Sequence, residues 1–237
     1  MQHDYFTQLY AEFESIQHLG SESPAKRLSE VLAYVIRKAI LSDVLKQGTP
    51  IRERALADEL NVSRTPVREA LFVLQGEGLV TLNHNRSACV AHFSREDIKN
   101  IYSLRGVLES FSAECAAKNH DQSQLERVRE ALAKYQLLDA QSSQLAQAQA
   151  DLEFHDTILV AAGSQILTTI TRQVLAVTIT HRSRYAYTPE QLKQAQTQHE
   201  SIFNAISTGD YALAKWLMAE HVNKSSDLAV QHLSSFA

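Results

Sequence analysis

The sequence predicts a mainly α-helical protein: an N-terminal winged helix-turn-helix domain followed by an all-α bundle of six to seven helices. Two observations lead to this fold class. Residues 51–92 have the pattern of two short helices, a tight turn and a small β-hairpin. Residues 94–237 keep helical periodicity almost throughout, with one proline and three glycines. We expect an amphipathic arm over residues 1–22, the winged domain over 23–93 and the helical domain over 94–237.

The arm carries aromatic and aliphatic residues at helical spacing. These residues are Tyr5, Phe6, Leu9, Tyr10, Phe13 and Ile16. We interpret the arm as a helix docked on another part of the protein. A helix lying on a membrane surface is the weaker alternative, because no lysine or arginine flanks the apolar stripe. A hinge at residues 20–24 leads to the first helix of the winged domain, which is expected to end near Ser42.

The helix-turn-helix is predicted from residues 52–74. The first helix is expected to turn Ala55, Leu56 and Leu60 inward. Residues 61–63 form the turn, because Asn tolerates a left-handed backbone and Ser is a frequent N-cap. The second helix follows and accepts Pro66 in its first turn, where no N–H is needed.

Arginines lie where such a motif meets DNA. Arg64 and Arg68 are four residues apart near the N-terminus of the second helix, which enters the major groove in helix-turn-helix proteins. Thr65 and the free helical N–H groups suit a phosphate. The alternative is an ordinary helical hairpin with solvated arginines. The β-hairpin predicted over residues 79–90 forms a wing and favours DNA binding.

The charge distribution fits this division. Residues 24–93 contain ten Lys and Arg against seven Asp and Glu, whereas the whole chain carries a net charge of −4. A basic segment on an acidic remainder is typical of a modular DNA binder. No transmembrane span or signal peptide is expected, and Cys89 and Cys115 match no metal or disulfide spacing. We therefore expect a cytoplasmic protein that does not contact membranes.

The second domain is predicted to be a helical bundle. Capping and turn residues divide it into helices over residues 94–119, 122–139, 142–162, 165–187, 189–208 and 210–232.

Four polar side chains in these helices could ligate a metal. Asp151 and His155 are four residues apart and therefore share one helix face, and His199 and His221 fall on later helices. One Asp and three His suit a divalent ion such as Zn²⁺, Ni²⁺, Mn²⁺ or Fe²⁺. The spacing alone is a weak signal, and it favours solvated or capping roles over coordination.

The helix-turn-helix resembles the GntR family of bacterial transcription regulators. The resemblance is carried by Ser63 to Leu71, SRTPVREAL, and by Glu77 to Val80, EGLV, and it covers roughly residues 25–92. By position it implies that Arg54, Arg64 and Arg68 contact DNA and that Thr65 contacts a phosphate. It also implies a wing contact by Arg86 and Ser87. Ser87 stands where the family usually has glycine.

The second domain resembles the FCD-type effector domain of the FadR-like branch of that family. The segments DLEFH (151–155), QHE (198–200), EHV (220–222) and RGVLE (105–109) carry the resemblance. It implies a divalent metal on Asp151, His155, His199 and His221, with a small organic acid completing the coordination. Arg105 and Arg172 are candidates to hold the acid, although either could be a surface or salt-bridged arginine. Ser164 replaces the asparagine that is common after Gly163.

The sequence therefore predicts a transcription regulator, usually a repressor, whose operator binding responds to a carboxylate at a metal. We expect a homodimer on a palindromic double-stranded operator, because one winged domain has a small footprint. A metal sensor and a metal-dependent hydrolase are the alternatives. The hydrolase would leave the winged domain unexplained, so we expect no enzymatic activity.

Overall fold

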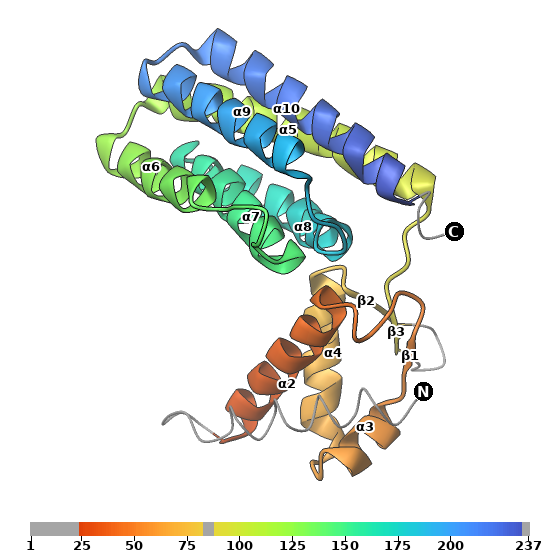
Figure 1. The fold of residues 1–237 in the computed structure, drawn as a ribbon. Coiled ribbons are helices and arrows are strands. Elements are labelled where there is room, and N and C mark those ends of the chain that lie inside the picture. Colours follow the sequence, from red (N-terminus) through yellow and green to blue (C-terminus); the bar gives the residue numbers. More distant parts are fainter. Residues whose placement is uncertain (1–23, 83–87, 234–237) are drawn as a thin grey trace. The chain divides into compact units, whose positions relative to one another are not determined.

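The computed structural model describes residues 24–82 and 88–233, and the chain divides after His92 into two compact units (Figure 1). The predicted arm over residues 1–22 and the wing-tip residues Arg86 and Ser87 lie outside the described residues. The winged unit ends at His92 and the helical unit begins at Phe93.

The winged unit has the helix and strand order of a winged helix-turn-helix. It contains α2 (Pro24–Leu41), β1 (Pro50–Ile51), α3 (Glu53–Glu59), α4 (Arg64–Gly76), β2 (Val80–Leu82) and β3 (Ala88–Val90). The strands form an antiparallel sheet in the order β1-β3-β2, with Val80 opposite Val90. The wing predicted from the sequence is confirmed. Strand β1 was not predicted, because two residues are too short to show alternation.

The turn between α3 and α4 has the expected backbone. Asn61 is left-handed at φ 50°, and Ser63 occupies the N-cap of α4 without a side-chain hydrogen bond. The prediction for Ala55 was wrong: Ala55 is exposed, whereas Ala57 is buried. Because α3 begins at Glu53, its inward positions follow the i, i+3, i+4, i+7 spacing from that residue.

The helical unit consists, within the residues described, of six helices. They are α5 (Arg95–Asn119), α6 (Gln122–Gln136), α7 (Gln144–Ala161), α8 (Gln165–Arg182), α9 (Pro189–Ser207) and α10 (Tyr211–Leu233). Helix α5 packs along α10 and also against α7, α8 and α9, which makes it the central helix of the bundle (Figure 1). The apolar core is built around Phe154, Ile158, Ile202 and Met218. The predicted all-α bundle is confirmed.

Capping side chains set the helix starts. Ser94 and Asp97 form a capping box at α5, and Thr188 and Gln191 form another at α9. Ser164 accepts a hydrogen bond from the Leu167 N–H and so caps α8. The residue that departs from the family pattern therefore keeps a capping function.

Helix α8 ends at Arg182, five residues before the predicted end at 187. The chain leaves the helix there and buries Tyr185 and Tyr187 against Tyr135, Leu192 and Ala195. Burial of two large aromatic rings outweighs the local helical preference of this segment.

Candidate metal centre and recognition helix

The predicted DNA-contacting arginines lie at the start of α4. Arg64 is its first residue, and the side chains of Arg64 and Arg68 keep 59% and 38% of their surface exposed. Both point toward one nearly buried acid, Glu53 of α3. Arg68 donates to Glu53 Oε2 from Nε at 3.2 Å and from Nη2 at 3.0 Å, and Arg64 Nη2 lies 3.8 Å from the same oxygen.

Two further predicted contact residues are also exposed. Thr65 follows Arg64 in the first turn of α4, where N–H groups lack helical partners. Arg54 lies on α3, with Nε 3.7 Å from Asp58 Oδ2. The winged unit therefore presents three arginines and a threonine from its helix-turn-helix to solvent.

The four predicted metal ligands converge inside the helical unit. One ligand atom from each of Asp151, His155, His199 and His221 lies within 4.8 Å of all the others, and all four residues are buried. Helix α7 supplies Asp151 and His155, α9 supplies His199 and α10 supplies His221. Three helices far apart in sequence thus meet at one point.

Hydrogen bonds on the far side of the rings aim two histidines inward. His155 Nδ1 contacts the Glu109 carboxylate, and His221 Nδ1 donates to Gln198 Oε1 at 2.8 Å. A neutral imidazole carries one N–H, so these partners assign Nε2 of both rings as a lone-pair acceptor. This is the arrangement that orients metal-bound histidines in proteins.

The Nε2 atoms of His155 and His221, both assigned as acceptors, lie at hydrogen-bonding distance with no hydrogen between them. The Nε2 atom of His221 lies 3.2 Å from that of His155 and 3.1 Å from that of His199, whose Nε2 is 3.5 Å from Asp151 Oδ1. Neighbouring ligands at about 2.0–2.2 Å from one ion are separated by about 2.8–3.6 Å, from octahedral to tetrahedral geometry. A cation stabilises lone pairs that face one another in this way, so the donor set fits a divalent metal.

Burial favours the ligating form of two histidines. It lowers the pKa of His199 and of His221 well below the ordinary value, and positive charge on neighbouring histidines acts in the same direction. Both rings are therefore neutral at neutral pH, as a metal ligand must be.

Arg105 lies beside this centre and is fully engaged with an acid. It is 3% exposed, and its Nε donates to Glu109 Oε1 at 2.6 Å. Burial alone would raise the pKa of Glu109, but Arg105 and His155 hold it below its ordinary value. Arg105 is therefore linked to the predicted metal ligands indirectly, by its ion pair with Glu109, which contacts His155.

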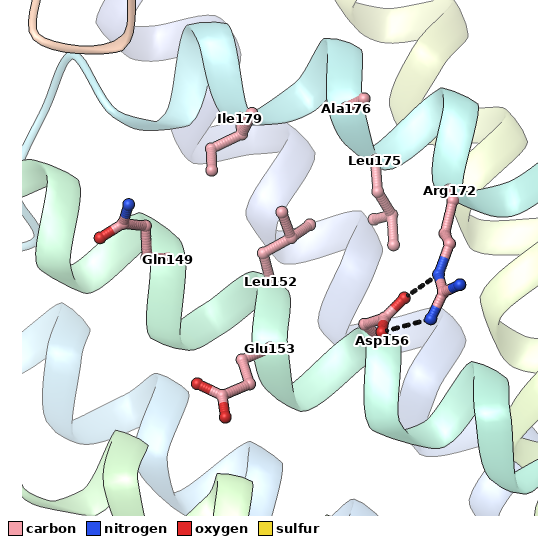
Figure 2. A pocket seen from close by; sticks show the side chains of 8 residues that line it. All are labelled: Gln149, Leu152, Glu153, Asp156, Arg172, Leu175, Ala176 and Ile179. Carbon is pink, nitrogen blue, oxygen red and sulfur yellow. Dashed lines mark hydrogen bonds and ion pairs between the residues drawn. The ribbon is translucent and has the colours of Figure 1, made fainter. Parts of the chain in front are cut away.

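Arg172 is not brought to the ligand cluster. Its guanidinium forms two hydrogen bonds with Asp156, at 2.6 and 2.8 Å, in a cavity of about 340 Å³ between α7 and α8 (Figure 2). That cavity is lined by Gln149, Leu152, Glu153, Asp156, Arg172, Leu175, Ala176 and Ile179, none of which is a predicted metal ligand. We therefore leave Arg172 out of the site.

Sequence reasoning missed three residues at the centre. Glu109 lies in the quoted RGVLE segment and Gln198 directly precedes His199, but neither was given a role. Arg182, in the last turn of α8, is buried among tyrosines close to the ligand cluster. Only its position beside two tyrosines, in the segment RSRYAY, could have drawn attention to it.

A winged helix-turn-helix with exposed recognition arginines, followed by a helical unit with a buried polar centre, defines a two-domain DNA-binding transcription regulator. Residues 28–90 match the bacterial regulatory proteins of the gntR family, and residues 100–224 match the FCD domain. The chain therefore belongs to the GntR family of bacterial transcription regulators, in the FadR-like branch that carries an FCD domain.

Curated relatives agree with this assignment. The chain is 31% identical over 206 residues to the gluconate operon transcriptional repressor of Bacillus subtilis, a match that covers 80% of this chain and 82% of the relative. It is 28% identical over 202 residues to the Glc operon transcriptional activator of Escherichia coli K12, covering 76% and 80%.

Solved structures share the fold. McbR/YncC of E. coli superposes with a TM-score of 0.72 at 20% identity, covering 87% of this chain and 98% of that one. A putative GntR regulator from Rhodococcus sp. RHA1 superposes with a TM-score of 0.70 at 25% identity, with the same coverage.

The relatives and both matched domains are those of transcription regulators and not of enzymes. The hydrolase alternative is therefore set aside. Among the described helices, none has the length and apolar character needed to cross a membrane.

Proposed function

We propose that this regulator binds a divalent metal through Asp151, His155, His199 and His221, and that a small carboxylate bound at the metal modulates operator binding. The convergence of four buried donors is the observation that carries the proposal. Zn²⁺, Ni²⁺, Mn²⁺ and Fe²⁺ all suit one carboxylate and three imidazoles. On a six-coordinate ion, four protein ligands leave positions for carboxylate oxygens of the effector.

On the DNA side, we propose that Arg64 and Arg68 contact bases or phosphates from α4, and that Thr65 and Arg54 contact the backbone. Their exposure at the start of α4 and on α3 supports these roles. Arg86 and Ser87 remain sequence predictions for the wing. Repression is the proposed mode, because a relative at 31% identity is named a repressor.

Side-chain contacts connect the proposed metal site to helix α5. His155 contacts Glu109, and Glu109 is paired with Arg105, so two α5 side chains respond to the position of one ligand. Helix α5 begins three residues after the end of the winged unit. We therefore propose α5 as the element that transmits the effector signal. Its effect on DNA is limited by the difference in effector affinity between the two conformations.

A homodimer is proposed on the basis of apolar surface. Helix α5 exposes Leu104, Val107 and Phe111 at i, i+3 and i+7, and α10 exposes Leu213 and Trp216. Such a face is typical of an interface between subunits, and two winged units would match a palindromic operator. Light scattering should give twice the monomer mass, and Val107→Glu should lower the association. A wild-type monomer at micromolar concentration, with and without DNA, would contradict the dimer.

The deciding experiment is an operator titration in three states: metal-free, metal-loaded, and metal-loaded with a carboxylate. The operator comes from selection on random duplexes, and the protein is purified without nickel resin or chelator. We expect operator affinity to change about 5- to 150-fold on addition of an effective carboxylate to the metal-loaded protein. The same acid should have no effect without metal.

Metal sensing is the second candidate, because the four ligands are complete without any added molecule. It predicts that metal alone shifts operator affinity and that no carboxylate adds to the shift. An operator affinity that responds to neither metal nor acid would refute both candidates.

A further inference from the structure

Arg182 is a buried cation with no acidic partner among the residues that the structure describes. The residue is 3% exposed, and its Nη1 donates to the Tyr185 carbonyl at 2.9 Å. Its Nε and Nη2 have no hydrogen-bond partner among residues 24–82 and 88–233, and no carboxylate of those residues lies within ion-pair distance. Burial of hydrogen-bond donors without acceptors destabilises a folded protein, so the unpaired edge formed by Nε and Nη2 needs an explanation.

Arg182 is surrounded by aromatic and polar side chains, one of which contacts a proposed metal ligand. The guanidinium lies over the rings of Tyr187 and Tyr185, at 3.9 and 5.0 Å from their centroids. The Tyr135 hydroxyl and Ser183 Oγ are also buried without a partner in the described part of the chain. The Tyr135 ring lies 4.4 Å from the His199 ring, so one aromatic side chain links these surroundings to the ligand cluster.

Arg182 stays charged in this environment. Burial lowers its pKa, but Tyr187 and the Asp151 carboxylate more than offset that effect, and the pKa lies above the ordinary value. Asp151 is itself one of the proposed metal ligands. Arg182 therefore lies close enough to the ligand cluster to interact electrostatically with one of its members.

The buried charges balance only without the metal. In the described part of the helical unit, the buried Lys, Arg, Asp and Glu side chains are Arg105, Arg182, Glu109 and Asp151, two positive and two negative. A divalent ion on the four ligands adds two positive charges. Buried charge without compensation is strongly unfavourable, so the loaded site favours a ligand with two negative charges.

We infer that the effector is a small acid with two carboxylates, one on the metal and the other on the free Nε–Nη2 edge of Arg182. That edge matches a carboxylate bidentately. This inference rests on the proposed function, in which a carboxylate binds at the metal. From the sequence, Arg105 and Arg172 were the candidates to hold the acid, but their guanidinium groups are paired with Glu109 and Asp156. The inference gives this role to Arg182 instead.

The first test compares acids of equal carbon number on the zinc-loaded full-length protein. Calorimetry would measure the dissociation constants of malonate, succinate and glutarate against propionate, butyrate and valerate, with lactate as a hydroxylated monoacid. At least one diacid should bind about ten-fold or more tightly than its matched monoacid, as expected for a charge-assisted hydrogen-bond pair.

The second test asks whether Arg182 is responsible for the preference for diacids. Arg182→Gln and Arg182→Lys should reduce diacid affinity toward that of the monoacid and leave monoacid affinity and zinc content unchanged. Arg172→Gln is the matched control, because it removes an exposed arginine of the same helix, α8, and it should retain the diacid preference. Zinc content and thermal unfolding measured without acid show whether each variant is folded.

The outcomes separate the inference from the proposed function. Equal binding of diacids and monoacids, a preference that survives in Arg182→Gln, or lactate matching the best diacid would each overturn the inference alone. Failure of every acid to bind the zinc-loaded protein would overturn the proposed function. The comparison of acids on the wild type stands even where an Arg182 variant is unstable.

Discussion

The recognition helix and the metal centre use charge in opposite ways. On α4, the side chains of Arg64 and Arg68 are 59% and 38% exposed and share one acid, whereas Arg105 and Arg182 in the helical unit are both 3% exposed. Water satisfies a solvated arginine until DNA arrives, so α4 is complete without a ligand. A buried arginine needs its partner inside the protein. The comparison teaches that the stability of the helical unit depends on a bound ligand more than the stability of the helix-turn-helix does.

Both regions nevertheless orient a functional group with a buried acid. Glu53 accepts hydrogen bonds from Arg68, and Glu109 bridges Arg105 and His155. The acids are 8% and 1% exposed. The more buried acid should matter more, and two of the four variants described below test this.

The largest effect is expected from removing two metal ligands. His199→Ala combined with His221→Ala should reduce metal content from about one ion per chain to none, because two donors rarely hold a divalent ion. Elemental analysis of protein purified without nickel resin measures this. The control pair is His92→Ala with His120→Asn, since both histidines are exposed and Asn tolerates the left-handed backbone of residue 120. Metal retained in the first variant would refute the assigned ligands.

The next effect concerns DNA. Arg68→Ala should cost ~1–3 kcal/mol of specific binding if the side chain contacts a base, because no other group at that position can replace the guanidinium. Operator affinity measured by fluorescence anisotropy checks this, with Arg129→Ala on α6 as an exposed arginine control. A folded Arg68→Ala protein with unchanged operator affinity would remove this residue from the interface.

A smaller effect is expected from changing Glu109, which contacts the proposed metal ligand His155. Glu109→Gln should weaken metal binding about 10- to 100-fold, because the amide no longer orients His155 as a carboxylate does. Competition with a coloured chelator gives the affinity, and Glu126→Gln on the surface of α6 is the control. Unchanged metal affinity would limit Glu109 to neutralising Arg105.

The smallest effect is expected at Glu53. Glu53→Gln should weaken the hydrogen bonds that orient Arg68. As a result, selectivity for operator over random DNA should fall by about 0.5–1.5 kcal/mol. Loss of the negative charge should at the same time strengthen binding to random DNA. The measurement is the ratio of the two affinities, with Asp58→Asn as the exposed control. A ratio equal to that of the wild type would show that Glu53 only supports the fold.

The two regions also differ in how far the sequence predicts them. The helix-turn-helix depends on contacts between near neighbours, so turn residues and apolar spacing locate it almost completely. The metal ligands come from three helices, and the sequence spacing joins only Asp151 and His155. Without the family resemblance, the grouping of His199 and His221 with these two residues rested only on ligand type, which is a weak signal.

The remaining differences between the sequence predictions and the structure have the same cause. Arg172 and Arg182 look alike in sequence, and only packing shows that one is paired with Asp156 and the other is buried beside the ligand cluster. The early end of α8 depends on where Tyr185 and Tyr187 find aromatic neighbours. Such long-range packing has no local signature.

Adjacent positions on α9 have separate tasks: His199 supplies a ligand atom, and Gln198 holds His221 of α10 in place. One inserted or deleted residue earlier in α9 would rotate both side chains by about 100° about the helix axis. The loop between α6 and α7, at residues 137–143, carries no such pair. During divergence of the family, length changes should accumulate in that loop and be eliminated from α9.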